Sequence, residues 1–325
     1  MAATASQSVL DAQGARLHQR FQARSLVERQ AESAYSYVRV FKMVQIAHEL
    51  VTTGKQATQR ELYYRLLQPP FFQTTREVNE AIQDAISVLR VPRAALGICC
   101  SSRGAVAGRL LIQEQPGAGW IDCSSQGIAG KSIPGNSAAI HAMQFQTDAS
   151  FIIVVEKDAV FQRLAEDQFF HTVPSIIVTA KGMPDMSTRL FLSALHEAFP
   201  CLPVLGVVDW NPSGMAILGV YKYGSVRMGL ESPRYAVPAL KWLGVRRHML
   251  EGADEEVWQP LSSRDKALLR SLRQGALRHS RSWQAEADLM EKYGSKAEIE
   301  AIYSLCGMGG LADVLATAIF RGDYA

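Results

Sequence analysis

Phe151-Ile-Ile-Val-Val-Glu-Lys-Asp158 is a short apolar run that ends on an acid, and Val204-Leu-Gly-Val-Val-Asp-Trp-Asn-Pro-Ser-Gly214 repeats this pattern further along the chain. Runs rich in Val and Ile are typical of strands that are buried on both faces. A carboxylate at the carboxyl end of such a strand lies at the edge of an α/β sheet where ligands bind. Glu156 and Asp209, on neighbouring strands, would therefore form a hard oxygen site for Mg²⁺. The alternative is that both acids only cap the helices that follow them.

The region around these two runs alternates between strand-like and helix-like patterns. Alternation at this spacing predicts a parallel sheet with helices on its faces. The remainder of the chain, 225–325, has a mostly helical pattern that is interrupted by prolines. The strands are expected at 151–155, 175–179 and 204–208, and the helices at 158–167, 187–198 and 212–221.

The first half of the chain has a different pattern. Helical spacing of apolar residues recurs at 35–51, 58–67 and 76–89, and strand-like segments follow at 96–100 and 106–112. Three helices followed by a β-ribbon are typical of a winged helix-turn-helix, which is a DNA-binding module. The second helix begins with a capping-box pattern, Thr58-Gln-Arg-Glu61.

The length of 325 residues allows two domains, and we expect an α/β protein, α+β as a whole, with a winged-helix domain at 31–145 and an α/β domain with a parallel sheet at 146–325. Residues 1–30 are rich in Ala, Gln, Ser and Arg, and we expect a loose or partner-ordered segment there. A net charge of +3 is compatible with nucleic-acid binding but does not establish it. The five cysteines lack zinc-site spacing and suggest free thiols in a reducing compartment. No run approaches the apolar length of a membrane span.

Five motifs occur in order along the chain. They are Arg60-Glu-Leu-Tyr-Tyr64, Glu156-Lys-Asp-Ala-Val-Phe161, Thr179-Ala-Lys-Gly-Met-Pro-Asp185, Asp209-Trp-Asn-Pro-Ser-Gly214 and Tyr221-Lys-Tyr-Gly-Ser225. Together they resemble one known family, namely the A-type subunits of type IIB topoisomerases (topoisomerase VI) and their meiotic relatives, the Spo-eleven double-strand-break proteins. That family joins a winged-helix domain with a nucleophilic tyrosine to a Toprim domain that holds Mg²⁺. The resemblance spans about residues 35–305 and favours the meiotic relatives, and the second plant-type paralogue in particular at 209–212.

This resemblance implies a transesterification in which Tyr64 attacks a DNA phosphodiester, forms a 5′-phosphotyrosyl bond and releases a 3′-hydroxyl. A tyrosine hydroxyl is a weak nucleophile at neutral pH. Arg60, one helical turn earlier, is a candidate to stabilise the phenolate or the phosphate. Mg²⁺ at Glu156 and Asp209 would stabilise charge on the leaving oxygen, and Glu156 is also a candidate general acid. The neighbouring Tyr63 is interpreted as a packing residue.

The chain departs from the family at Asn211, where the usual pattern is Asp-x-Asp. Asn retains a carbonyl ligand for the metal but loses a negative charge, which leaves the second metal position open. Asp158 is a candidate to compensate, or it is a helix N-cap. Further candidates for contacts to DNA phosphates are Lys181 and two residues of the expected wing, Arg103 and Arg109.

The resemblance also implies the partners. They are double-stranded DNA, a second A-type chain that completes each active site, and a topoisomerase VI B-like subunit that supplies ATP hydrolysis, all in the nucleus and without a membrane. The function expected is meiotic double-strand-break formation. The alternatives are a somatic A-type topoisomerase VI subunit that reseals breaks, and a non-catalytic DNA-binding paralogue, which Asn211 keeps open. A Toprim primase or nuclease would leave the tyrosine motif unexplained.

Overall fold

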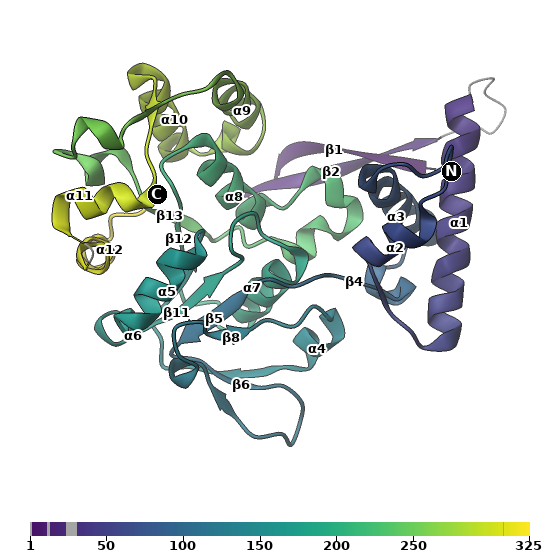
Figure 1. The fold of residues 1–325 in the computed structure, drawn as a ribbon, viewed down its shortest axis with the longest axis horizontal. Coiled ribbons are helices and arrows are strands. Elements are labelled where there is room, and N and C mark those ends of the chain that lie inside the picture. The colour runs from purple at the N-terminus through teal and green to yellow at the C-terminus, as the bar shows by residue number, and fades with distance from the viewer. Residues whose placement is uncertain (1, 12–13, 24–30, 308) are drawn as a thin grey trace.

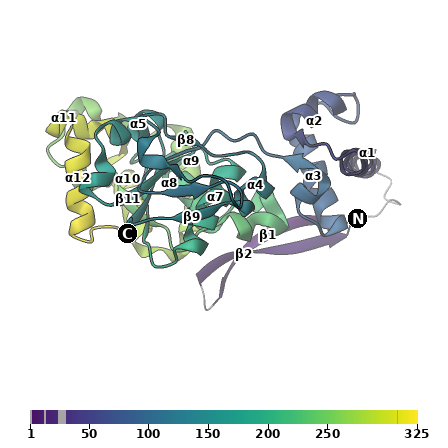
Figure 2. The same cartoon turned by 90° about the horizontal axis from the view of Figure 1, so that it is seen from below.

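Two lobes of unequal size make up the computed structural model, which describes residues 2–11, 14–23, 31–307 and 309–325 (Figure 1). The smaller lobe contains α1, α2 and α3, and the larger lobe contains the main sheet and the C-terminal helices. A view from below shows the same separation between the α1–α3 group and the rest of the chain (Figure 2).

The three helices predicted for the smaller lobe are present. Capping boxes start two of them, with Thr58 and Glu61 at the start of α2, and Thr74 and Glu77 at the start of α3. Their apolar faces meet in one core, which includes Met43, Leu62, Val78, Ile82 and Ile98. The elements of this lobe are α1 (Ala31–Thr53), β3 (Ala57–Thr58), α2 (Gln59–Leu66), α3 (Thr75–Leu89), η1 (Arg93–Leu96) and β4 (Ile98–Cys99).

The ribbon that follows the third helix differs from the prediction. β3 and β4 form only a two-residue parallel pair. The next strand, β5 (Ala105–Gly108), pairs instead with a strand of the large sheet, and all four of its residues are buried. The prediction of a wing at 106–112 is therefore wrong. A wing strand has one exposed face, whereas both faces of β5 are covered.

The boundary between the lobes is accordingly earlier than the expected 145. The apolar core of the smaller lobe ends at Ile98, and the core of the larger lobe begins at Ala105. Arg103 therefore lies in the segment that connects the lobes, and Arg109 lies in the larger lobe. The prediction that both residues lie on a wing is wrong as well.

The larger lobe is built on a six-stranded sheet with the order β13-β12-β10-β11-β5-β8. The first four strands are parallel, and β5 is antiparallel to both of its neighbours. Three of the parallel strands, β12, β10 and β11, are those that the sequence predicts, whereas β13 lies in a stretch expected to be mostly helical. The strands besides β5 are β10 (Phe151–Val155), β11 (Ser175–Thr179), β12 (Val204–Val207), β13 (Lys241–Gly244) and β8 (Lys131–Ser132).

The register of β10 and β12 brings the two sequence acids to one edge. Val155 is paired with Val207, and the N–H of Glu156 donates to the carbonyl of Val207. Glu156 and Asp209 thus leave neighbouring strands at the same edge of the sheet, where α5 and α8 begin. The helices after the parallel strands are α5 (Asp158–Glu166), α6 (Phe169–Thr172), α7 (Met186–Ala198) and α8 (Pro212–Tyr223).

Shorter elements surround this sheet. Between β5 and β10 in the chain lie β6 (Leu111–Gln113), β7 (Ile121–Asp122), η2 (Cys123–Ser125), α4 (Ser137–Ala142) and β9 (Gln144–Gln146). After α8 lie η3 (Val226–Tyr235), η4 (Arg247–Leu250), η5 (Glu255–Val257), β14 (Gln259–Pro260), α9 (Ser263–Gln274), η6 (Ala276–His279), α10 (Arg281–Tyr293), β15 (Ser295–Lys296), η7 (Ile299–Ala301), α11 (Ile302–Cys306) and α12 (Gly310–Phe320). Among the described residues no single helix has the length and apolarity to cross a membrane; one pair, Ile299–Cys306 with Gly310–Phe320, passes by length and composition and is bent by 104°.

Several contacts join the lobes. Arg93 of η1 forms a buried ion pair with Glu231 of η3, 3.0 Å from Nε to Oε2. β1 (Ala2–Asp11) and β2 (Gly14–Ala23) pair antiparallel where a loose segment was expected, and they contact α3 on one side and η3 and α8 on the other (Figure 1). The other residues of the predicted loose segment, 1, 12–13 and 24–30, lie outside the described part.

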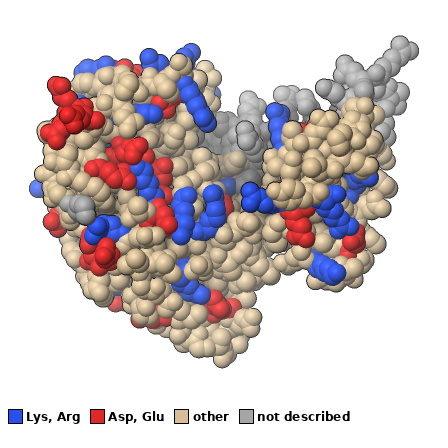
Figure 3. Space-filling view, viewed as in Figure 1, with Lys and Arg blue, Asp and Glu red and all other residues tan. Residues whose placement is uncertain are grey.

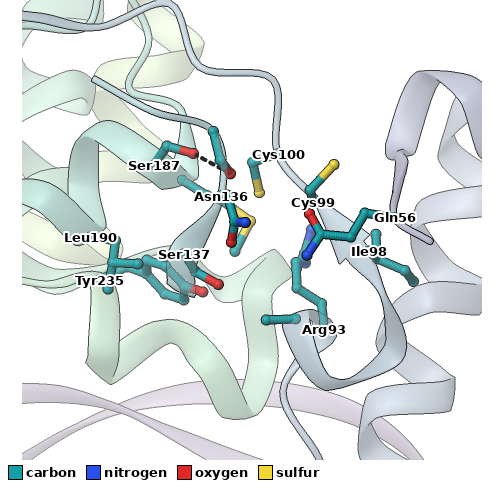
Figure 4. A pocket seen from close by; sticks show the side chains of 13 residues that line it. Gln56, Arg93, Ile98, Cys99, Cys100, Asn136, Ser137, Ser187, Leu190 and Tyr235 are labelled. Carbon is teal, nitrogen blue, oxygen red and sulfur yellow. Dashed lines mark hydrogen bonds between the residues drawn. The ribbon is translucent and has the colours of Figure 1, made fainter. Parts of the chain in front are cut away.

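A crevice of about 350 Å³ opens between the lobes (Figure 4). Gln56 and Cys99 reach it from the smaller lobe, and Ser187 and Tyr235 line it from the larger lobe. The Ser187 hydroxyl donates a 3.2 Å hydrogen bond to the carbonyl of Gly135 across one wall.

Candidate active site

The tyrosine pair of α2 separates into one packed and one exposed ring. Tyr64 is 67% exposed, and its ring centroid lies 5.4 Å from that of Tyr63. Tyr63 packs against the core of the smaller lobe, and its hydroxyl is 3.5 Å from the carbonyl of Gln73. Tyr64 is therefore the more exposed ring of this pair and projects from an ordered helix, where a large substrate has access to it.

Arg60 lies one turn before Tyr64 on the same helix and is exposed. Within the described ranges it makes no ion pair, whereas Arg65 of the same helix pairs with Glu49 of α1. The capping box at Thr58 fixes the start of α2, so it also fixes the direction in which Arg60 and Tyr64 leave the lobe.

Glu156 and Asp209 form the second part of the candidate site. The backbone N–H of Asp209 donates a 3.0 Å hydrogen bond to Oε2 of Glu156. Asp209 Oδ1 accepts the backbone N–H of Ile299 at 2.9 Å, and Asp209 is only 5% exposed. The fold brings these two acids together, as the sequence predicts, because β10 and β12 are adjacent in the sheet.

Burial raises the pKa of both carboxyl groups. The pKa of Glu156 is raised to about 7, mainly by burial and to a smaller extent by the negative charge on Asp209. Burial also raises the pKa of Asp209, although Lys157 and the N–H of Ile299 oppose that shift. Two buried carboxylates that repel each other are stabilised by a bound cation, and carboxylate oxygen is the donor that Mg²⁺ prefers. The acid pair therefore fits a divalent metal ion.

Lys157 is a member of the site that the sequence interpretation missed. Its ammonium lies 3.1 Å from Oδ1 of Asp209, 3.0 Å from Glu298 and 2.6 Å from Glu300. Burial acts to lower the pKa of Lys157, but the hydrogen bond to Glu300 and the charge on Asp209 outweigh it and raise the pKa above its ordinary value. No sequence signal indicated that residues 298–300 return to this edge.

Asn211 has a structural role in this geometry. Its side-chain oxygen accepts the N–H of Gly214 at 2.7 Å and caps α8, while its amide nitrogen lies 3.3 Å from Oδ2 of Asp209. The oxygen that we expected to bind metal is thus already an acceptor for the helix start. A direct metal contact by Asn211 stays a prediction, and the described residues contain no group of three His, Cys, Asp or Glu side chains arranged to hold a metal ion.

A third element, the turn after β11, lies beside the acids. The N–H of Gly182 donates to the carbonyl of Glu156 at 2.8 Å. Lys181 has a φ of 58°, an uncommon conformation for a side-chain-bearing residue, and its ammonium lies 3.2 Å from Oδ1 of Asp158. Arg103 donates its backbone N–H to Asp185 and its guanidinium to the carbonyl of Met183, so it borders the same turn.

Arg109 lies apart from these groups. Its guanidinium donates to the carbonyl of Phe170 and to Asp148, both within the larger lobe. A phosphate contact by Arg109 would compete with these two contacts, and Arg109 lies away from the acid pair, so the structure argues against one. Basic and acidic side chains are interspersed over the face in Figure 3 and do not form one large basic surface.

Aromatic rings around the buried Trp210 hold the loop that carries Asp209. Trp210 is fully buried, and its indole N–H donates to Glu286 at 2.7 Å. The guanidinium of Arg247 lies 3.9 Å from the ring centroid of Trp258 and 4.6 Å from that of Tyr293. The C-terminal helices are therefore packed around the loop, and they limit the freedom of Asp209.

Comparison with known families agrees with this division into a tyrosine lobe and an acid lobe. The model described as Type IIB DNA topoisomerase matches residues 35–98, and the model for the Toprim domain of the topoisomerase 6 A-subunit and Spo11 matches residues 151–308. The chain belongs to this family of topoisomerase 6 A-subunits and Spo11 proteins. Toprim domains generally bind divalent metal ions, which agrees with the acid pair at the sheet edge.

Individual relatives are similar over most of the chain. The meiotic recombination protein SPO11-2 of Oryza sativa subsp. japonica is 44% identical over 296 residues, which are 90% of this chain and 76% of that protein. The protein of the same name from Arabidopsis thaliana is 43% identical with the same coverage. The A-subunit of DNA topoisomerase 6 from Arabidopsis thaliana is 36% identical over 266 residues, which are 81% of this chain and 61% of that protein.

Proposed function

We propose that this chain makes DNA double-strand breaks in meiotic recombination by transesterification at Tyr64. The Tyr64 oxygen attacks a backbone phosphorus, the bond from phosphorus to the 3′-oxygen breaks, and a 5′-phosphotyrosyl link and a 3′-hydroxyl result. The phenolic proton is transferred to the departing oxygen in net terms, so no ATP or oxidant is consumed. The observation that carries the proposal is the exposed Tyr64 hydroxyl on a capped helix in a chain that also holds a paired-acid edge.

Mg²⁺ is the proposed cofactor, held by Glu156 and Asp209, with Asn211 beside them. When bound, the ion would stabilise negative charge on the leaving 3′-oxygen and position the DNA backbone. Without the ion, the raised pKa of Glu156 lets this carboxyl hold a proton near neutral pH. As a general acid it would deliver that proton to the leaving oxygen, with Asp209 then holding the ion. Arg60, on the same helix face as Tyr64, is suited to stabilise the phosphate.

Each active site is proposed to combine Tyr64 of one chain with the acids of another. Tyr64 belongs to the smaller lobe, whereas Glu156 and Asp209 belong to the larger lobe. No hydrogen bond or ion pair joins α2 to either acid within the part of the chain that the structure describes. Two chains related by a two-fold axis would place one tyrosine on each DNA strand, as a double-strand break requires.

The proposed partners follow from this assignment. They are double-stranded DNA, a second A-type chain, and a topoisomerase VI B-like subunit that would contribute ATP hydrolysis, with a nuclear location. The exposed side chains of Tyr37, Phe41 and Val51 on α1 offer apolar area for a partner helix. The second A-type chain would be another copy of this chain or a paralogue.

Two other functions are each supported by a specific observation. Similarity to the A-subunit of DNA topoisomerase 6 supports a somatic enzyme that reseals its breaks. Asn211, which replaces a carboxylate of the family pattern, supports a non-catalytic DNA-binding paralogue. Resealing predicts recovery of intact DNA from the covalent adduct, and the non-catalytic function predicts that no adduct forms.

The proposal is tested by isolating protein–DNA adducts from the chain assembled with its partners. Tyr64→Phe removes one hydroxyl and should abolish the adduct while DNA binding and the thermal transition stay unchanged. Tyr63→Phe is the matched control, since it removes the neighbouring hydroxyl, and it should give adducts at normal yield. Adducts of normal yield in the Tyr64→Phe chain would refute the assignment.

A further inference from the structure

Lys157 sits among three carboxylates at the edge of the metal site. Its ammonium contacts Oδ1 of Asp209 as well as Glu298 and Glu300, and its side chain is 23% exposed. An ammonium held by three carboxylates is already neutralised by the protein, so it does not need DNA or solvent to satisfy its charge. The proposed chemistry at Tyr64 assigns this lysine no part.

One short segment supplies the groups that hold Lys157 and Asp209 together. The N–H of Ala297 donates to the carbonyl of Trp210 at 3.0 Å, which pairs this segment with the loop after β12. Ile299 donates its N–H to Asp209, and the residues on either side of it, Glu298 and Glu300, both reach Lys157. Glu298 occupies the N-cap position of the short helix η7 and Glu300 lies within it, so this one turn of chain brings both glutamates to Lys157.

Asp209 consequently has little capacity left for a second positive charge. Oδ1 accepts from Ile299 and contacts Lys157, while Oδ2 faces the amide nitrogen of Asn211. A divalent ion that binds at Glu156 and Asp209 approaches an ammonium on the same carboxylate. Two positive charges that share one carboxylate repel each other, so the position of Lys157 influences how tightly the metal binds.

We propose that Lys157 is a built-in counter-ion of the acid pair, positioned by Glu298 and Glu300, and that it lowers and thereby sets the affinity of the site for divalent metal. It occupies one cation position at Asp209 and leaves the position towards Glu156 for the metal ion. Lys157, Glu298 and Glu300 are positioning residues, because they act through Asp209. This inference rests on the proposed metal-binding function of Glu156 and Asp209.

The test measures Mn²⁺ binding to the intact chain in the absence of DNA at pH 8.5. Electron paramagnetic resonance reports the fraction of Mn²⁺ that is bound. Lys157→Met should bind Mn²⁺ about tenfold more tightly than the parent chain, because the competing charge is gone. Lys157→Arg keeps the charge and should not tighten binding. Lys266→Met, which removes an exposed lysine of α9, is the control for a general change in charge and should leave the affinity unchanged.

The glutamates provide an independent measurement. Glu298→Gln with Glu300→Gln leaves Lys157 with Asp209 as its remaining carboxylate and should weaken Mn²⁺ binding several-fold. The same pair of changes should have a smaller effect in the Lys157→Met chain, since the glutamates act through the lysine. If Lys157→Met fails to fold, the double variant Glu298→Gln with Glu300→Gln tests the inference by itself. A Mn²⁺ affinity equal to that of the parent chain in this double variant would overturn the inference.

The outcomes separate this inference from the proposed function. Loss of Mn²⁺ binding in Asp209→Asn, together with unchanged or weaker binding in Lys157→Met, would overturn the counter-ion role and leave the metal site intact. Parental Mn²⁺ binding in Asp209→Asn would instead refute the metal site itself, and the counter-ion role with it.

Discussion

Arg93 and Glu231 form a buried ion pair across the junction between the tyrosine lobe and the acid lobe. The guanidinium Nε lies 3.0 Å from Oε2, and the backbone N–H of Arg93 donates to Oε1 at 2.9 Å. The side chains are only 7% and 3% exposed, so water does not replace either partner. The pair therefore fixes how the lobe that carries Tyr64 is oriented on the lobe that carries the acids.

We expect Glu231→Gln to destabilise the chain by roughly 3 kcal/mol, because it removes the negative charge from a buried ion pair. Glu166→Gln breaks the exposed i,i+3 pair with Arg163 and should cost no more than about 1 kcal/mol. Urea unfolding of the two variants measures the difference. Equal costs would mean that the junction pair contributes no more than a surface contact.

The stability of the metal-free chain should depend on pH through Glu156. Its pKa in the folded chain is about 7, against an ordinary value of 4.5, mainly because of burial. The group's contribution is therefore fully present below pH 4.5 and is lost as pH rises through about 7. Relative to Glu156→Gln, the parent chain should lose on the order of 2–3 kcal/mol over this window.

Thermal unfolding in a chelating buffer at a series of pH values measures that difference. A parent chain that gains stability over Glu156→Gln between pH 5 and pH 8 would contradict the raised pKa. Addition of Mg²⁺ at pH 8 should reverse the loss, because the ion stabilises the ionised pair.

Substitutions at Asn211 separate its cap from its proposed metal contact. Asn211→Asp keeps an oxygen for the N–H of Gly214, adds a charge beside Asp209, and should tighten Mg²⁺ binding. Asn211→Ala should cost about 1 kcal/mol of stability through the lost cap. It should weaken metal binding less than Asp209→Ala, which removes a full charge. If Mn²⁺ titration shows Asn211→Ala to be as damaging as Asp209→Ala, this division of roles is wrong.

DNA binding should be dominated by phosphate contacts and should weaken steeply with salt. Lys181 lies on the turn beside the acid pair, and Lys181→Ala should lower the salt slope by about one unit. Arg109→Ala should leave the slope unchanged, because Arg109 lies apart from the acid pair, on the carbonyl of Phe170 and on Asp148. Fluorescence anisotropy over a salt series measures both, and a slope near zero in the parent chain would contradict phosphate recognition.

The sequence was most informative where a local pattern decides the structure. Buried strands such as Phe151–Val155 and capped helices such as Gln59–Leu66 depend on near neighbours, and both were predicted. Ala105–Gly108 was assigned to a wing, because a short apolar strand carries no mark of the sheet that it joins. The contacts of Lys157 with Glu298 and Glu300 depend on the path of the C-terminal segment, which no local pattern encodes.

The central claim is that Tyr64 of one chain acts with the acids of a second chain. It is tested most directly by mixing Tyr64→Phe chains with Glu156→Ala chains, together with the B-type partner and DNA, and identifying which chain becomes covalently linked. A mixed dimer contains one site with Tyr64 from the Glu156→Ala chain and intact acids from the Tyr64→Phe chain. We predict an adduct on the Glu156→Ala chain alone, although each variant is inactive by itself. Absence of any adduct in proven mixed dimers, or an adduct on the Tyr64→Phe chain, would contradict the account.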